Sequence, residues 1–316
     1  MAKKLVVILG PTASGKSALA VNLAKKFNGE IISADSRQVY RGMDLGSGKI
    51  TQKEMKGVTH HLLDVVSPQK RFDVVQYRKL AQKAIAQIMR KGKTPILCGG
   101  TGFYIQAIID GIIIPEIKPD WRLRSDLEHL SAEELFEKLK KFDQRRAENI
   151  DRSNRRRLIR ALEIVMKSGK PVPILKKEPL PYPVLMVGIK KTPQDLKKLI
   201  AKRLQQRLKI GMVDEVKKLH QSGVSWKRLE EFGLEYRWIA RYLKTIKDFR
   251  NPLKFERISE IPKSVSFEKS LFFNRLQKET EHFAKRQMTW FKRDKRIHWI
   301  KNQKAAEKLV KIFVKK

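Results

Sequence analysis

The sequence feature that most constrains the fold is the segment Gly10–Ser17, which reads GPTASGKS. It follows the apolar run Leu5–Leu9 and precedes Ala18–Val21, so it lies between a predicted strand and a predicted helix. This is the spacing G-x-x-x-x-G-K-[ST] of a phosphate-binding loop in its strand–loop–helix context. Glycines let successive backbone N–H groups turn toward phosphate oxygens, and the helix N-terminus adds a favourable dipole. We therefore expect a phosphate or diphosphate at this loop.

The side chains of the loop fit the same ligand. Lys16 supplies a positive charge, and the hydroxyl of Ser17 can bind Mg²⁺. A glycine-rich turn without a ligand is the alternative, but strand, helix, lysine and serine together favour the phosphate site. The residues assigned to the diphosphate are Gly10, Pro11, Thr12, Ala13, Ser14, Gly15, Lys16 and Ser17.

Length and composition set the broad class. A chain of 316 residues suits one large α/β domain with an insertion. No apolar run approaches the length of a membrane span, and no secretory signal precedes the first strand, so we expect a cytoplasmic protein. Cys98 is the single cysteine, which excludes an intrachain disulfide and a thiolate zinc cluster.

The charge balance points to a polyanionic partner. The chain has 70 Lys and Arg against 33 Asp and Glu, a formal net charge of +37. Basicity of this size favours nucleic acid. Adaptation of a whole proteome to high temperature is the alternative, but that regime usually enriches acidic residues together with lysine. Acidic residues are scarce here, so nucleic acid is the preferred reading.

Two further predicted strands end in residues suited to a site. Ile31–Ala34 is followed by Asp35, and Thr94–Cys98 is followed by Gly99-Gly100-Thr101. The carboxyl ends of parallel strands share one sheet edge, so Asp35 and Thr101 should lie beside the phosphate loop. A helix cap is an equally good reading of Asp35 taken alone. The metal-binding Asp that usually ends a strand in ATPases is missing, which disfavours a motor ATPase.

Two shorter segments leave alternatives open. The glycine-rich stretch Gly42–Lys49 could flank the phosphates or simply turn the chain, and the turn is the simpler reading. His60 and His61 are adjacent, but no cysteine or further histidine is near them in the sequence, so metal ligation is not expected.

The composition changes over residues 116–177, where glycine almost disappears and helical spacing dominates. Seven arginines lie between Arg145 and Arg160. They predict a clamp for a phosphate backbone, with a solvated helix face as the alternative. We expect residues 116–177 to form an inserted helical domain and residues 1–115 and 178–316 to form the core.

The C-terminal part returns to the core. Val184–Ile189 predicts another parallel strand, and a long helix is predicted from about Phe267 to Phe291. This helix ends in the basic segment Lys285–Arg293, which also carries Trp290. Aromatic residues among positive charges suit stacking on unpaired bases, or they pack the segment on the core. Packing is favoured for Trp290 and RNA binding for the charges.

Seven ordered motifs resemble those of the bacterial tRNA dimethylallyltransferases, also called tRNA isopentenyltransferases. They are GPTASGKS, ADSRQVYRGMDLGSGK, HHLLDVVSP with FDVVQYRKLA, GGTGFYIQAI, NRRRLIRALEI, GLEYR and KRQMTWFKRD. The resemblance covers nearly the whole chain. The departures are mild: Ser17 replaces a frequent Thr, GSGK replaces G-T-A-K at 46–49, and Gln144 replaces a usual Pro.

The resemblance implies an α/β fold with a parallel sheet like that of P-loop NTPases, helices on both faces and an inserted helical domain that binds tRNA. It implies transfer of a dimethylallyl group from dimethylallyl diphosphate to the exocyclic amine of the adenosine 3′ to the anticodon, with Mg²⁺ as cofactor. Asp35 would be the general base, and Thr101 would help to position the amine. The residues assigned to tRNA are Asp35, Ser36, Arg37, Gln38, Thr101, Arg122, Arg156, Arg157, Leu158, Ile159, Arg160, Lys285, Arg286, Gln287, Thr289 and Trp290.

Other functions compete with this one. A phosphate-loop kinase or a prenyltransferase for free adenine nucleotide would need neither the arginine-rich region nor the basic tail. A non-catalytic RNA-binding protein would not need Asp35 and Thr101 at strand ends beside the loop. A monomer is the expected state, and the sequence does not reveal which tRNAs are substrates.

Overall fold

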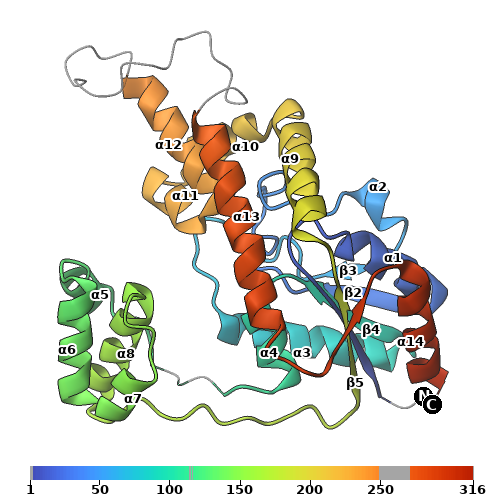
Figure 1. The fold of residues 1–316 in the computed structure, drawn as a ribbon, viewed down its shortest axis with the longest axis horizontal. Helices are drawn as coiled ribbons and strands as arrows, with labels where there is room; N and C mark the ends of the chain where they lie inside the picture. The colour runs from blue at the N-terminus through green and yellow to red at the C-terminus, as the bar shows by residue number, and fades with distance from the viewer. Residues whose placement is uncertain (1–2, 114, 116, 249–270, 316) are drawn as a thin grey trace. The chain divides into compact units, whose positions relative to one another are not determined.

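The computed structural model describes residues 3–113, 115, 117–248 and 271–315. Its centre is a six-stranded sheet in the order β3-β2-β4-β1-β5-β6, in which every neighbouring pair is parallel (Figure 1). The strands are β1 (Leu5–Leu9), β2 (Gly29–Ser33), β3 (His60–His61), β4 (Thr94–Gly99), β5 (Val184–Ile189) and β6 (Ile297–Ile300).

The helices between and after these strands agree with the predicted α/β class. They are α1 (Lys16–Lys26), α2 (Gln52–Met55), α3 (Val74–Arg90), α4 (Gly102–Ile109), α5 (Trp121–Leu127), α6 (Ala132–Phe142), α7 (Gln144–Glu148), α8 (Arg155–Ser168), α9 (Pro193–Lys209), α10 (Met212–Gln221), α11 (Trp226–Phe232), α12 (Leu234–Asp248), α13 (Leu271–Phe291) and α14 (Gln303–Lys315). The predicted start of the long helix at Phe267 lies outside the described residues. None of the described helices combines the length and the apolarity needed to cross a membrane.

The sheet is buried on both faces, which explains the unbroken apolar run of β1. Leu5, Val7 and Leu9 point to a core shared with α3 and α4. Val6 and Ile8 point to the opposite core, shared with α1 and α14. Alternate strand residues face opposite sides, so a strand covered by helices on both sides must be apolar throughout. The predicted parallel sheet with helices on both faces is confirmed.

A third core lies at the carboxyl edge of the sheet. It joins Val39–Met43, which follow β2, to apolar residues of α9 through α13. Helix α13 packs against both α9 and α12. This helical layer places polar side chains from distant parts of the sequence next to the predicted site.

The chain divides into two compact units. The sheet unit comprises Met1–Ile109 and Leu180–Lys316, and the helical unit comprises Asp110–Pro179. The helical unit has its own core, which includes Leu135, Leu158 and Leu162. The predicted insert, residues 116–177, falls within the helical unit, although its first residue lies outside the described residues.

Candidate functional site

The phosphate loop joins β1 to α1 in a conformation that few residues adopt. Gly15 precedes the helix with φ of 89°, and Ala13 has φ of 60°. A Cβ at Gly10 would lie 2.9 Å from Ser14 Oγ, so the loop closes tightly on itself. Ser14 Oγ is buried and has no hydrogen-bond partner among the described residues. A buried hydroxyl without a partner is costly, and a bound anion would satisfy it.

Lys16 lies within the loop at the start of α1. Its Nζ donates a hydrogen bond to the Pro11 carbonyl at 3.3 Å. Burial lowers the pKa of Lys16, whereas the negative charge of Asp35 acts to raise it. Lys16 follows the carboxyl end of β1 and Asp35 that of β2, and both strands pair in parallel with β4, so the two groups lie at the same edge of the sheet.

Asp35 and Thr101 are brought together by backbone hydrogen bonds. Asp35 Oδ1 accepts a hydrogen bond from the Arg37 amide at 2.9 Å. Thr101 Oγ1 accepts one from the Ser36 amide at 3.0 Å, and the Thr101 amide donates to the Ala34 carbonyl at 3.1 Å. The ends of β2 and β4 are therefore tied to each other directly beside Asp35.

Gln287 of α13 ties the phosphate loop to the end of β4. Its Oε1 accepts from the Thr12 amide at 2.8 Å, and its Nε2 donates to the Gly100 carbonyl at 2.8 Å. A Cβ at Gly100 would lie 2.4 Å from Gln287 Nε2, so only glycine leaves room for this contact. The side chain assigned to RNA contact from the sequence is thus buried and holds the loop in place.

The other glycines at this strand end also make room for close neighbours. A Cβ at Gly99 would lie 2.1 Å from the Ala34 carbonyl oxygen, and a Cβ at Gly102 would lie 2.3 Å from Trp290 Cδ1. Trp290 is half-buried, and its ring meets Phe103 edge-on with centroids 6.5 Å apart. The packing interpretation of Trp290 agrees with this position.

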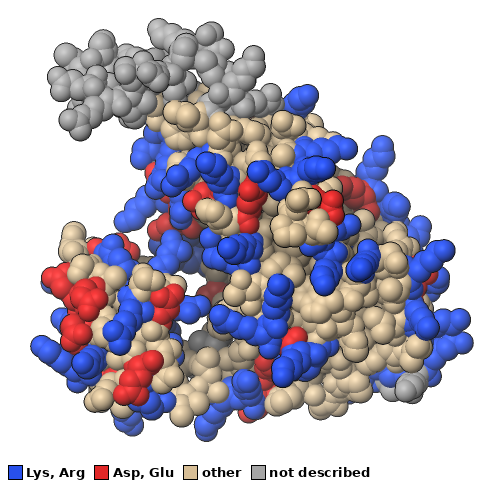
Figure 2. Space-filling model, viewed as in Figure 1, with Lys and Arg blue, Asp and Glu red and all other residues tan. Residues whose placement is uncertain are grey.

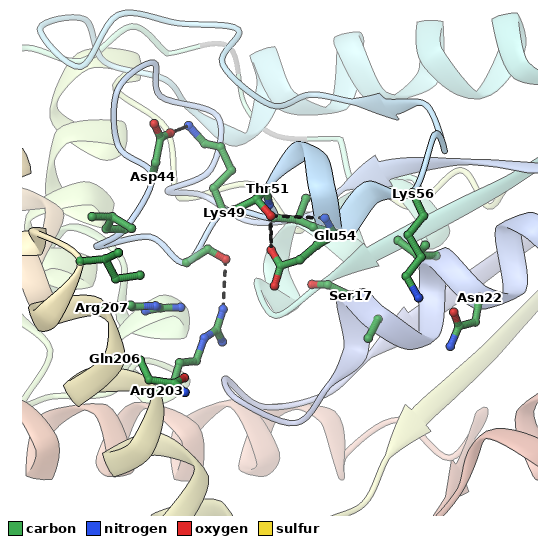
Figure 3. A pocket seen from close by; sticks show the side chains of 16 residues that line it. Ser17, Asn22, Asp44, Lys49, Thr51, Glu54, Lys56, Arg203, Gln206 and Arg207 are labelled. Atoms are coloured by element: carbon green, nitrogen blue, oxygen red, sulfur yellow. Dashed lines mark hydrogen bonds and ion pairs between the residues drawn. The ribbon is translucent and has the colours of Figure 1, made fainter.

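Sequence reasoning missed two cations of α9 near the loop. Arg203 Nη2 donates to the Gly48 carbonyl at 3.1 Å, and Arg207 Nη1 lies 3.6 Å from Glu235 Oε1. Burial lowers the pKa of both arginines, that of Arg203 to about 10. Both point from α9 into a cavity of about 340 Å³ that Ser17 also lines (Figure 3). Their only sequence signal is a spacing of four residues, which is common on solvated helices.

The glycine-rich segment is fixed by a carboxylate of α10. Glu215 accepts hydrogen bonds from the three amides of residues 44–46 at 2.6 to 3.0 Å. The side chain of Lys49 is almost fully buried, and its ammonium group pairs with Asp44 and Asp64. Lys49 therefore holds the turn together, while Gly48 accommodates the α9 arginines.

The predicted contacts after β2 also hold neighbouring segments. Arg37 Nε donates to the Phe232 carbonyl at 2.6 Å, and Gln38 Nε2 donates to the Gly48 carbonyl at 3.3 Å. Ser36 is half-buried next to Thr101. On α13, the predicted contacts with side chains at the surface are Lys285, Arg286 and Thr289.

The arginine-rich part of the helical unit separates into two groups. Arg156 and Arg157 are exposed at the start of α8, and Arg122 is exposed at the start of α5. Arg160 instead pairs with the buried Glu163, which also binds Arg124 at 2.7 Å. Three more arginines bind within the unit: Arg145 to the Val172 carbonyl, Arg155 to the Glu128 carbonyl and Arg152 over the Phe136 ring.

Leu158 and Ile159 are buried in the core of the helical unit. They lie between the exposed arginine pair and Arg160 along the same helix. Their side chains are therefore not at the surface, and the exposed part of this motif is the arginine pair.

The sequence profile described as IPP transferase matches residues 38–294. The chain belongs to this family. It is 39% identical to tRNA dimethylallyltransferase 1 of Geotalea uraniireducens, in an alignment that covers 99% of this chain and 98% of that protein. It is 40% identical to tRNA dimethylallyltransferase 1 of Syntrophus aciditrophicus, over 95% of this chain and 94% of that one.

Solved structures agree with the family. The tRNA isopentenylpyrophosphate transferase of Bacillus halodurans superposes with a TM-score of 0.68 at 34% identity, covering 99% of this chain and 95% of that one. A eukaryotic dimethylallyltransferase acting on tRNA gives a TM-score of 0.71 at 26% identity, covering 92% of this chain and 70% of that one. The family and the fold predicted from the motifs are both confirmed.

Proposed function

We propose that this IPP transferase is a tRNA dimethylallyltransferase. It transfers the five-carbon group of dimethylallyl diphosphate to the exocyclic amine of the adenosine 3′ to the anticodon. The observation that carries the proposal is the single hydrogen-bonded frame that holds the phosphate loop, Asp35 and Thr101 at one sheet edge. A diphosphate leaving group and a base for an amine are the two parts that this reaction needs.

The donor diphosphate binds in the phosphate loop. The loop amides, Lys16 and the hydroxyl of Ser14 face the anion, and Arg203 and Arg207 add positive charge from α9. Ser17 fits Mg²⁺, because its hydroxyl lines the cavity and this ion commonly takes further ligands from substrate phosphates and water. When bound, Mg²⁺ would neutralise charge on the departing diphosphate.

Asp35 acts as the general base. The bond between the donor carbon and its oxygen breaks, the electron pair leaves with diphosphate, and the amine nitrogen forms the new bond to carbon. The amine proton passes to the Asp35 carboxylate. Thr101 acts through position, because its hydroxyl holds the Ser36 amide next to that carboxylate.

The tRNA is held by positive charge on both units. Arg122, Arg156 and Arg157 are the exposed contacts of the helical unit, and Lys285 and Arg286 are those of α13. These side chains would contact phosphates and so position the RNA. The target adenine must leave its stack to reach Asp35, which costs a few kcal/mol that such contacts offset.

Mass analysis of tRNA nucleosides tests the function directly. Unmodified tRNA is incubated with the protein, dimethylallyl diphosphate and Mg²⁺, then digested. We expect an adenosine heavier by one five-carbon group, and free diphosphate in equal amount. Phosphate transfer from ATP to a nucleotide, without prenylated adenosine, would instead support the kinase alternative.

A further inference from the structure

A second and larger cavity lies on the sheet unit, outside the site described above. It measures about 980 Å³ and is formed by the segment after β5, the start of α9, one face of α13 and Lys301 after β6. Four apolar side chains of its lining, those of Leu196, Ile200, Ala284 and Met288, are buried or half-buried and form its floor. We call it the lysine groove, because its rim consists of Lys190, Lys191, Lys197, Lys285, Lys292 and Lys301.

The lining carries net positive charge, because its six lysines outnumber its two acidic residues. All six lysines are exposed, and none of their ammonium groups pairs with a carboxylate of the described residues. The two acidic residues accept hydrogen bonds from neutral groups: Asp195 from the Thr192 hydroxyl at 2.8 Å, and Glu281 from Gln277 at 3.0 Å. They keep their negative charge, so six lysines and two carboxylates give the lining a formal charge of +4. Lys and Arg side chains also spread over the viewed face of this unit, where they outnumber Asp and Glu side chains (Figure 2).

Helix α13 connects the groove to the candidate active site. Lys285, Met288 and Lys292 line the groove, while Gln287 binds the phosphate loop from another face of the same helix. A helix with its side chains is about 10 Å across, so the groove lies roughly one helix width from the reacting edge. Any RNA whose adenosine reaches Asp35 has neighbouring phosphates within that range.

We propose that the lysine groove binds the sugar–phosphate backbone of the tRNA anticodon arm. The inference rests on the proposed function, and it adds a binding surface that the motifs did not assign, apart from Lys285. Lysines on four separate segments around an open groove suit a polymer with regularly spaced charges. A small anion would need donors that converge on one point. A membrane surface would need apolar side chains that protrude, whereas here they form the floor.

The test compares two triple variants with the same loss of charge. The groove variant is Lys191→Ala, Lys197→Ala and Lys301→Ala. The control is Lys25→Ala, Lys79→Ala and Lys83→Ala, three exposed lysines of α1 and α3 that do not line the groove. Binding of an anticodon stem–loop RNA is measured over a range of salt concentrations, beside dimethylallyl diphosphate binding and single-turnover transfer at saturating RNA.

We expect the groove variant to bind the stem–loop about tenfold more weakly or worse, and its log–log salt slope to fall by about 2. Its donor affinity and its saturated transfer rate should match those of the wild type, as should all properties of the control. Equal RNA affinities of the two variants would overturn the inference. The inference would also be overturned if the groove variant kept its RNA affinity but lost binding to vesicles that contain phosphatidylserine. That result would assign the groove to a membrane.

The outcome is separable from that of the proposed function. If the wild type binds the stem–loop but prenylates no tRNA, the proposed function fails. The groove is then still judged by the difference in RNA binding between the two variants.

Discussion

At the scale of single residues, a substitution of Asp35 distinguishes the chemical step from the binding of the substrates. In the wild type, Asp35 Oδ1 accepts a hydrogen bond from the Arg37 amide at 2.9 Å. Asp35→Asn keeps the size of the side chain and an oxygen that can accept this hydrogen bond, but it removes the basic carboxylate. General-base contributions are about 10²–10⁴-fold, so single-turnover prenyl transfer should slow by about that factor. Donor affinity should stay nearly constant. Transfer at the wild-type rate would exclude Asp35 as the base, and loss of donor binding would place it in the metal site.

Lys16 provides the complementary test of the donor site. Lys16→Ala removes a charge-assisted contact that typically contributes about 1.5–3 kcal/mol, so donor affinity and turnover should collapse. RNA affinity should barely change, because the exposed basic surfaces remain. Lys25→Ala, at an exposed position in the last turn of the same helix, is the matched control. An equally steep fall in RNA affinity would show that the loop is not a dedicated diphosphate site.

At the scale of elements, the phosphate loop depends on α13, because the Thr12 amide donates to Gln287, which is 275 residues away in the sequence. Gln287→Leu leaves the Thr12 amide and the Gly100 carbonyl without their partners. Unsatisfied buried groups cost about 1–3 kcal/mol each, so both the free energy of unfolding and donor affinity should fall. Asn274→Leu, an exposed amide on the same helix, should change neither.

This variant also distinguishes the two roles of Gln287. If the side chain acts through the loop, the Kd for dimethylallyl diphosphate rises and the Kd for tRNA is unchanged. If the side chain instead contacts RNA, as the motif predicts, the Kd for tRNA rises and the Kd for dimethylallyl diphosphate is unchanged. Calorimetric unfolding and equilibrium binding of each substrate measure all of these quantities.

At the scale of the whole molecule, the two edges of the sheet have different tasks. The carboxyl edge carries the candidate site, whereas the amino edge carries an ion cluster around Glu30 at the start of β2. Glu30 is buried and binds His61 at 2.7 Å, Lys93 at 2.9 Å and Lys91 at 3.2 Å. Burial acts to raise the pKa of Glu30, but hydrogen bonds from Lys93, His61 and Lys91 together lower it to about 2.

The lowered pKa predicts how stability depends on pH. A carboxyl whose pKa is lower in the folded state stabilises the fold above its unfolded pKa of 4.5, and this stabilisation is lost as pH falls toward 2. Glu30→Gln should therefore cost up to about 3 kcal/mol of the free energy of unfolding at neutral pH. It should also flatten the decline in stability below about pH 5. Denaturant titrations at several pH values check this, and an unchanged acid limb would contradict it.

Binding of a polyanion also depends on the whole molecule, because the binding free energy sums over many charged side chains. Replacing Arg156 and Arg157 with Ala should weaken tRNA binding and lower the log–log salt slope by roughly 1 to 2. Lys140 and Lys141 of α6, exposed in the same helical unit, are the matched pair for a control variant. An unchanged salt slope would indicate that other basic side chains, such as those of α13, bind the phosphate backbone.

Local sequence determined the part of the site that lies on strand ends. The phosphate loop, Asp35 and Thr101 follow apolar runs, and parallel strands bring their carboxyl ends to one edge whatever the rest of the chain does. The edge strands β3 and β6 escaped prediction because two and four residues are too few to show a pattern. A buried parallel sheet with helices on both faces was nevertheless fixed by the apolar runs.

Tertiary structure alone decided which polar side chains face the site and which serve the fold. Arg203 and Glu215 read as ordinary residues of solvated helices, yet the helical layer places them against the glycine-rich segment. Gln287 lies in a basic motif but is buried, and Arg160 pairs with the buried Glu163. Hydrophobic periodicity specifies the apolar face of a helix, but the partner of a polar group depends on how distant helices pack. The sequence by itself therefore determined the family, the sheet and the reacting edge, and only the packing of the helices decided what surrounds that edge.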